Sequence, residues 1–343
     1  MYRILRAILF LLPPESAHNV VATLLKWTPK LPIINRVISL LYNVKTPKLE
    51  QQLFGLHFRN PIGMAAGFDK DCLLFNSLDS FGFSFVEVGS LTPLPQMGNP
   101  KPRLFRLPKD RALINRMGIN NRGVDHGVER LKRRRSKIVV GANIIKGTDT
   151  PNNLAYNDYK ESMLKLYPFV DFFTINISCP NVKDLTQLQE IESLTDILAQ
   201  LTAIRDGEST YRPILVKLSP DLSNRELDEI IEKLLLLRVD GIVATNTTTS
   251  RDNLTSSKEE LESIGEGGLS GAPLFEKSLE RVKYIRQRSE GKLPIVAVGG
   301  ISTPQQAHQM LEAGASLIQI YTSFIYNGPS FVKEVVNYLN SLK

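Results

Sequence analysis

The 343-residue chain is too long for one small domain, but it fits a single α/β barrel with an added segment. Its hydrophobic fraction of 42% and mean hydropathy of −0.10 are ordinary for a globular protein, and we find no apolar run of the roughly 18 residues that would cross a bilayer. Two cysteines exclude a disulfide framework, and four histidines without metal-ligand spacing predict no metal site.

The net charge of +7 is concentrated at the start of the chain. Residues 1–46 hold six lysines and arginines against one acid, Glu15, and so carry five of the seven net positive charges. This asymmetry suggests that the N-terminal segment meets an anionic surface, either a membrane or a nucleic acid.

The first 46 residues are expected to form a helical extension. Residues 1–12 begin like a signal peptide, but two prolines end the apolar run and no small-residue cleavage site follows. Apolar stripes predict helices at about 15–27 and 33–42, with Trp27 between them among lysines. These features favour helices that lie on a membrane surface, although packing against the rest of the protein would explain the stripes equally well.

After residue 46 the pattern changes to short apolar runs separated by helical stretches. Residues 49–60 predict a hairpin around Gly55. Runs rich in β-branched residues then predict eight buried parallel strands: 61–66, 83–89, 137–143, 171–177, 213–218, 239–245, 294–299 and 315–321. Because most gaps are long enough for a crossover helix, we predict a (β/α)8 TIM barrel over residues 47–343.

The polar residues at the carboxyl ends of these strands predict the chemistry of the site, since barrel enzymes place their active sites there. Lysines and amides dominate, and carboxylates are rare; the main residues are Lys70, Asn143, Asn176, Lys217 and Asn246. Such a rim suits an anionic ligand with many acceptor atoms and not a sugar that is cleaved by paired acids.

A phosphate site is predicted at Gly299-Gly300 and the loop after Tyr321, where glycines let backbone N–H groups approach an anion. No G-x-G-x-x-G motif follows a strand, so a dinucleotide-binding half is not expected. A single phosphate favours FMN over FAD or NAD. A barrel that binds a phosphorylated substrate without a cofactor fits these residues as well.

A series of motifs, in order along the chain, resembles the dihydroorotate dehydrogenase family, in particular its membrane-associated, quinone-reducing class (class 2). They are NPIGMAAGFDKD (60–71), GNPKPRLFRL (98–107), LINRMGINNRGVD (113–125), NISCPN (176–181), VKLSPDLS (216–223), ATNTT (244–248), GGLSG (267–271), VAVGGIST (296–303) and QIYTSFIYNGP (319–329). The resemblance implies FMN at the barrel mouth and oxidation of (S)-dihydroorotate to orotate in pyrimidine biosynthesis, with a membrane quinone as the final acceptor.

The motifs also imply site residues. The implied flavin contacts are Ala66, Gly67, Lys70, Ser90, Asn143, Asn176, Lys217, Thr245, Gly271, Gly300, Tyr321 and Thr322. The implied substrate contacts are Lys70, Asn115, Arg116, Met117, Gly118, Ile119, Asn176, Asn181, Asn246 and Thr247. His18 and Arg103 resemble residues at the family's quinone tunnel. These types suit the chemistry, because amides both donate to and accept from a pyrimidine edge, and lysines stabilise negative charge.

Cys179 is the general base that the resemblance implies; it would take the C5 proton of dihydroorotate while a hydride leaves C6 for the flavin. Here the chain departs from its class. The membrane class usually has serine at this position and phenylalanine at that of Ile119, whereas cysteine is typical of the soluble class. A soluble electron acceptor is therefore an alternative, and a flavin-free lyase that forms a Schiff base on Lys217 is another.

The expected partners follow from these features. We expect a monomer that binds dihydroorotate, orotate and a membrane quinone, and that lies peripherally on the cytoplasmic face of a bacterial cell membrane. The basic run 130–135 follows a helical stretch and is expected to face solvent, so no nucleic-acid partner is predicted.

Overall fold

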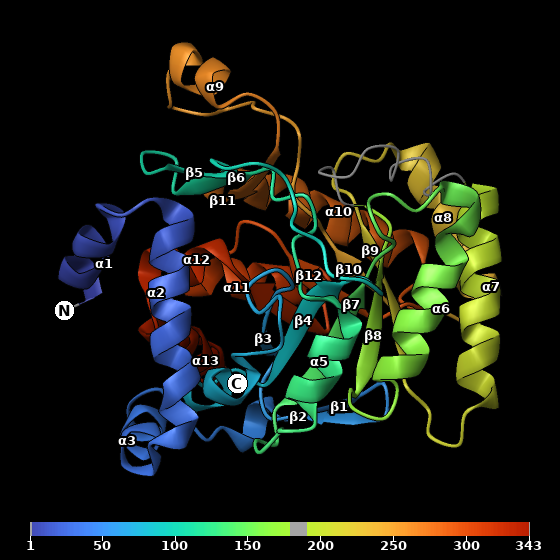
Figure 1. The fold of residues 1–343 in the computed structure, drawn as a ribbon, viewed down its shortest axis with the longest axis horizontal. Coiled ribbons are helices and arrows are strands. Elements are labelled where there is room, and N and C mark those ends of the chain that lie inside the picture. Colours follow the sequence, from blue (N-terminus) through green and yellow to red (C-terminus); the bar gives the residue numbers. More distant parts are fainter. Residues whose placement is uncertain (1, 179–190, 343) are drawn as a thin grey trace.

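The computed structural model describes residues 2–178 and 191–342, and in these ranges eight parallel strands close into a barrel (Figure 1). The strands are β3 (Ile62–Met64), β4 (Phe85–Leu91), β7 (Val139–Ile144), β8 (Phe172–Asn176), β9 (Ile214–Leu218), β10 (Gly241–Ala244), β12 (Ile295–Val298) and β13 (Leu317–Ile320). Hydrogen bonding joins them in chain order, and β13 pairs with β3 to complete the ring. Each predicted strand coincides with one of these eight, so the predicted barrel is confirmed.

Helices between the strands cover the outside of the barrel. They are α4 (Phe75–Leu78), α5 (Gly123–Leu131), α6 (Ala155–Leu166), α7 (Ile191–Gly207), α8 (Asn224–Leu236), α10 (Phe275–Arg288), α11 (Pro304–Glu312), α12 (Thr322–Asn327) and α13 (Ser330–Leu342), with single 3-10 turns at η1 (Thr28–Lys30), η2 (Pro47–Leu49), η3 (Asp79–Phe81), η4 (Asn152–Leu154) and η6 (Ala272–Leu274). Helix α8 illustrates how the local sequence specifies a helix and its buried face. Ser223 and Glu226 form a capping box at its start, and Leu227, Ile230 and Leu234 recur at helical spacing and are buried.

A hairpin of β1 (Gln51–Leu53) and β2 (Leu56–Phe58) packs against the barrel interior and lies at the lower end in Figure 1. The predicted hairpin around Gly55 is thereby confirmed. Inside, aromatic rings fill the space that glycines leave open. A Cβ on Gly63 would lie 2.3 Å from the ring of Phe85, and one on Gly141 would lie 2.0 Å from the ring of Phe172. The interior is thus a packed core, and any binding site must lie at its end.

A second, antiparallel sheet was not predicted. Its strands are β5 (Leu104–Leu107), β6 (Ala112–Asn115) and β11 (Gly268–Gly271), and it lies above the barrel in Figure 1, with α9 (Lys258–Ile264) beyond it. The Asp110 carboxylate accepts hydrogen bonds from the backbone and hydroxyl groups of Thr255 and Ser256, which ties the α9 segment to the β5–β6 turn. These short strands lie in the loops between barrel strands, and no single run of residues has the alternating pattern that would predict them.

The N-terminal segment forms three helices on one side of the barrel: α1 (Tyr2–Phe10), α2 (Pro14–Trp27) and α3 (Pro32–Tyr42) (Figure 1). The two predicted helices are confirmed to within a residue, and α1 is an addition. Helix α1 is held by Tyr2 and Arg6, which donate to the carbonyls of Ile325 (2.5 Å) and Tyr326 (2.7 Å). Large apolar side chains of all three helices face solvent, among them Ile4, Ile8, Leu24, Trp27, Ile33 and Leu40. In the described part of the chain no helix has the length and hydropathy needed to cross a membrane.

Candidate active site

A cavity of about 320 Å³ opens at the carboxyl ends of the barrel strands, between the barrel, the second sheet and helix α2. It collects most of the residues that the motifs implied. The implied residues that line it are Ala66, Gly67, Lys70, Ser90, Asn115, Met117, Ile119, Asn176, Lys217, Thr245, Asn246, Thr247, Gly271, Gly300, Tyr321, Thr322 and, from α2, His18. The structure therefore brings together side chains from nearly the whole length of the chain.

Four implied residues lie outside the lining. Arg103 lies behind Glu15, which does line the cavity, and Arg116 donates to the carbonyl of Ile264. Gly118 packs against Asn99, where an added Cβ would lie 2.5 Å from the amide oxygen. The fourth, Asn143, lies behind the lining residues Ser90 and Asn176 and contacts both. Cys179 and Asn181 lie outside the described residues.

A buried polar layer supports the floor of the cavity. Glu87 is fully buried and accepts hydrogen bonds from Asn143 (2.6 Å) and Gln319 (2.7 Å). The amide oxygen of Asn143 in turn accepts from Ser90 and from Asn176, both of which line the cavity. Asn143 thus fixes two lining residues and has a supporting position.

Gln319 is a lining residue that the sequence analysis missed. Its amide nitrogen donates to Glu87, whereas its Oε1 is buried and has no partner among the residues that the structure describes. A buried acceptor without a donor is costly, so this oxygen fits a ligand that presents an N–H group. The signal was available in the QIYTSFIYNGP motif, whose first residue is this glutamine.

Two lysines give the cavity positive charge. Lys217 lies on β9 with 6% of its surface exposed, and Lys70 follows β3 and donates to Asn120 at 2.6 Å. The charge of Lys70 also affects His18 of α2. Burial, and then the charge of Lys70, lowers the pKa of His18 to about 4, so its imidazole is neutral at physiological pH. His18 packs edge-on against Phe68 at 5.3 Å, which gives this end of the cavity an uncharged aromatic wall.

The lining at Gly300 and Thr322 has the geometry of an anion site. Gly300 has a φ of 72°, and an added Cβ would lie 2.2 Å from the backbone nitrogen of Phe275, so no side chain fits there. Helix α12 begins with Thr322, whose hydroxyl lies 2.9 Å from that of Ser270. Arg111, on the β5–β6 turn, also lines the cavity and pairs with Asn327 of α12. No motif marked this arginine.

A family model described as dihydroorotate dehydrogenase matches residues 48–342. The chain belongs to the dihydroorotate dehydrogenase family. It is 44% identical to the dihydroorotate dehydrogenase (quinone) of Christiangramia forsetii over 98% of this chain and 97% of that one, and 45% identical to the enzyme of the same name from Coxiella burnetii strain Dugway 5J108-111 over 99% and 96%.

Solved structures agree with these relatives. The structure of the dihydroorotate dehydrogenase of Eimeria tenella in complex with ferulenol superposes with a TM-score of 0.86 at 35% identity, over 96% of this chain and 91% of that one. The predicted family, its oxidoreductase class and its quinone dependence are therefore confirmed, and dihydroorotate dehydrogenases are flavin-dependent enzymes. Among residues 2–178 and 191–342 no group of metal-ligating side chains occurs.

Proposed function

We propose that the protein oxidises (S)-dihydroorotate to orotate in the synthesis of UMP, with FMN as the hydride acceptor and a membrane quinone as the final electron acceptor. The observation that carries this proposal is the set of residues that line the cavity. Its lining combines Gly271 and Gly300, Lys217 with the amides of the barrel rim, and His18 of the N-terminal helix. One cavity thus offers an anion site, polar groups for a substrate and a neutral imidazole from α2.

The cavity residues fit FMN. Gly271, Gly300, Thr322 and Arg111 would hold the phosphate, because close backbone approach, a hydroxyl and a guanidinium all suit an anion. Ala66, Gly67, Ser90, Asn176, Thr245, Lys217 and Tyr321 would surround the ring system, and the unpartnered oxygen of Gln319 would meet one of its N–H groups. When bound, FMN supplies the acceptor for a two-electron oxidation.

Dihydroorotate would be oriented by amides and by Lys70. Asn115, Asn176, Asn246 and Thr247 line one region of the cavity and offer donors and acceptors to the carboxylate and the pyrimidine edge. The Asn246 amide nitrogen is held by the backbone and hydroxyl oxygens of Ser178, both at 3.1 Å, which leaves its orientation well defined. We propose that the Lys70 ammonium pairs with the negative charge of the substrate.

We assign proton abstraction to Cys179, which follows the buried Ser178 directly. A thiol has an ordinary pKa of about 8.5, so a cysteine can act as a thiolate where a serine hydroxyl needs a proton relay. Cationic side chains close to a thiol favour its thiolate. This residue type occurs in the soluble class, but the basic helical extension supports a quinone acceptor.

Residues 1–46 are proposed as the membrane and quinone segment, and residues 47–343 as the flavin-binding barrel. The exposed apolar side chains of α1, α2 and α3, together with basic residues, suit the surface of an anionic bilayer. The Lys30 ammonium lies 4.3 Å from the ring centre of Trp27, an arrangement suited to the interface between lipid and water. We propose a monomer that lies peripherally on the cytoplasmic face of a bacterial membrane.

The electron acceptor can be tested directly on the purified protein. The flavin is first reduced anaerobically with dihydroorotate, and its reoxidation is then followed with short-chain ubiquinone, menaquinone, fumarate or NAD as the oxidant. The proposal expects rapid reoxidation by a quinone and slow reoxidation by fumarate and NAD. Preference for fumarate or NAD would assign the chain a soluble acceptor instead.

A further inference from the structure

Asp221 lies outside the cavity lining but is bonded to the loop that supplies two of the proposed substrate contacts. It belongs to the turn between β9 and α8, whereas its partners follow β10. One carboxylate oxygen accepts from the hydroxyl of Thr248 at 2.5 Å, and the other accepts from the Thr249 backbone N–H at 2.9 Å and its hydroxyl at 3.2 Å. The carboxylate therefore joins two neighbouring loops of the barrel mouth.

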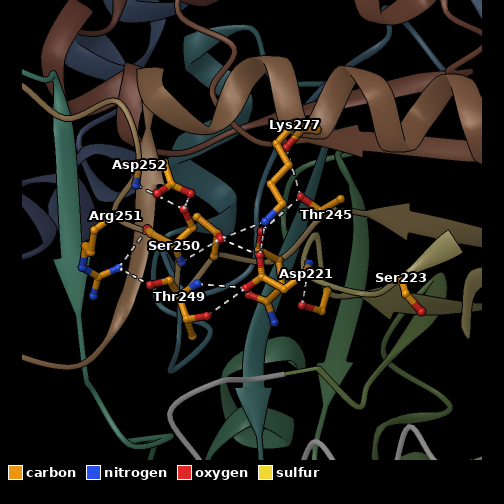
Figure 2. A network of polar contacts seen from close by, with 12 residues as sticks. Asp221, Ser223, Thr245, Thr249, Ser250, Arg251, Asp252 and Lys277 are labelled. Atoms are coloured by element: carbon orange, nitrogen blue, oxygen red, sulfur yellow. Dashed lines mark hydrogen bonds and ion pairs between the residues drawn. The ribbon is translucent and has the colours of Figure 1, made fainter.

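Lys277 of α10 completes this cluster. Figure 2 shows its side chain extending from the helix to Asp221, with Thr249 on another side of the carboxylate. The Lys277 ammonium pairs with the same oxygen that Thr248 uses and lies 3.5 Å from the Thr248 hydroxyl. Burial alone would raise the pKa of Asp221, but the hydrogen bonds from Lys277, Thr248 and Thr249 outweigh it and hold the pKa below its ordinary value. Asp221 is thus ionised and paired at physiological pH.

The neighbouring residues explain what the cluster can control. Asn246 and Thr247 immediately precede Thr248 and line the cavity. On one side their segment is fixed by β9, through the bond from the Asn246 N–H to the Leu218 carbonyl at 2.8 Å, and Thr248 pairs with Leu269 of β11. Beyond Thr248 the chain leaves the barrel for the α9 segment, and Asp221 accepts hydrogen bonds from Thr248 and Thr249 at the point where it leaves.

We propose that Asp221 and Lys277 are positioning residues, which hold Asn246 and Thr247 in the geometry that binds the pyrimidine ring of dihydroorotate and orotate. This inference rests on the proposed function. Neither residue touches the ligand; they act on the loop that does. Their loss should weaken binding of the pyrimidine and leave the flavin, which is held chiefly by other elements, in place.

The test uses the full-length, flavin-loaded protein and the variants Asp221→Ala, Asp221→Asn and Lys277→Met. The dissociation constant of orotate is measured from the change it causes in the flavin spectrum, and KM and kcat for dihydroorotate are measured alongside. We expect Asp221→Ala to weaken orotate binding about 10- to 100-fold, the range that corresponds to the loss of one or two net hydrogen bonds to a charged group. The effect should fall on KM, with kcat at saturation within about threefold of wild type.

The other variants give the expected order. Asn at position 221 keeps an oxygen that can accept from Thr248 or Thr249 but loses the charge opposite Lys277, so Asp221→Asn should recover part of the affinity lost in Asp221→Ala. Lys277→Met keeps the threonine bonds and should cost only severalfold. Asp228→Ala is the matched control. Asp228 of α8 likewise pairs with side chains of α10, Arg288 (2.8 Å) and Tyr284 (2.8 Å), but it has no bond to the loop at Thr248, so orotate binding should be unchanged.

The inference is overturned if Asp221→Ala binds orotate within twofold of Asp228→Ala, or if it loses flavin and orotate affinity in equal measure, as general loosening would cause. Should Asp221→Ala not fold, Asp221→Asn and Lys277→Met decide, and orotate affinities within twofold of wild type for both would refute it. A wild-type protein that neither binds orotate nor is reduced by dihydroorotate would instead refute the proposed function.

Discussion

Glu15 is expected to hold the N-terminal helix α2 against the barrel. Neutralising it should slow reoxidation of the flavin by a quinone and leave reduction of the flavin by dihydroorotate nearly unchanged. Its carboxylate accepts two hydrogen bonds from Arg103, at 2.8 and 3.2 Å, and lies 3.5 Å from Lys101. The Arg103 side chain is 8% exposed and that of Glu15 is 17% exposed, so water screens this pair little. Glu15 itself lines the cavity near His18.

The magnitude follows from what Glu15→Gln leaves behind. Removing one partner of a buried ion pair costs about 3–5 kcal/mol, because the other charge stays buried without compensation. Arg103 keeps two acceptors, the carbonyls of Met97 (2.7 Å) and Asn99 (2.9 Å), and glutamine still offers one oxygen. We therefore expect a loss of about 2 kcal/mol in the free energy that docks α2, roughly a 30-fold shift toward the undocked state.

Stopped-flow measurement of the two half-reactions tests this. Reoxidation of the reduced flavin by a quinone should slow severalfold or more in Glu15→Gln, and reduction by dihydroorotate should stay within about twofold of wild type. Glu129→Gln, which alters an exposed pair with Lys132 on the far side of α5, is the control and should change neither. Equal slowing of both half-reactions, or no slowing of reoxidation, would refute the role of this pair.

The same pair predicts a pH effect with a defined sign. The bonds from Arg103, together with the charge of Lys101, lower the pKa of Glu15 below its ordinary value of 4.5 even though burial opposes them. A carboxyl group with a depressed folded-state pKa stabilises the docked helix above pH 4.5, and this contribution is lost as the pH falls through the folded-state value. Quinone turnover of the wild type should therefore fall as the pH is lowered through the folded-state pKa of Glu15. The same acid-dependent fall should be absent from Glu15→Gln, because glutamine does not titrate.

Three further predictions address other parts of the account. Removal of residues 1–44 should leave a folded barrel whose flavin is still reduced by dihydroorotate, while quinone turnover and binding to anionic vesicles fall sharply. Undiminished quinone turnover would show that the extension is not the quinone site. Cys179→Ala should slow flavin reduction at least 10²-fold with orotate binding retained, and the wild-type rate should rise with pH through one ionisation in the thiol range; an unchanged rate would assign the base elsewhere. Gly141→Ala should lower the free energy of unfolding by about 1–3 kcal/mol, because the added methyl would meet the Phe172 ring at 2.0 Å, and Phe172→Leu in the same chain should offset part of this loss in a denaturant titration; additive losses would contradict the packing argument.

The barrel could be predicted because each of its strands is a local signal. A run such as Val139–Ile144 is buried along its whole length, so it is short, mostly apolar and without helical spacing. With Gln319 and Arg111 as exceptions, most of the lining residues were predictable for a related reason. They follow strand ends or lie in motifs, and the fold gathers all strand ends at one mouth.

The features that escaped prediction depend on contacts between distant parts of the sequence. Strand β11 pairs with β6 through residues such as Leu269 and Ile114, and neither short strand has a periodicity of its own. Helix α1 is fixed by Tyr2 and Arg6 against residues near position 325, which no local pattern reveals. Asp221 lies inside a recognisable motif, but its role depends on Lys277, a partner on another element.

The most direct test of the central claim is an anaerobic titration of the purified full-length protein with dihydroorotate, followed by its visible spectrum. The account predicts a yellow protein whose bound flavin is bleached by about one equivalent of dihydroorotate as orotate forms, and which releases noncovalent FMN on denaturation. A folded protein that turns over dihydroorotate without a flavin, or a flavin that dihydroorotate does not reduce, would contradict it.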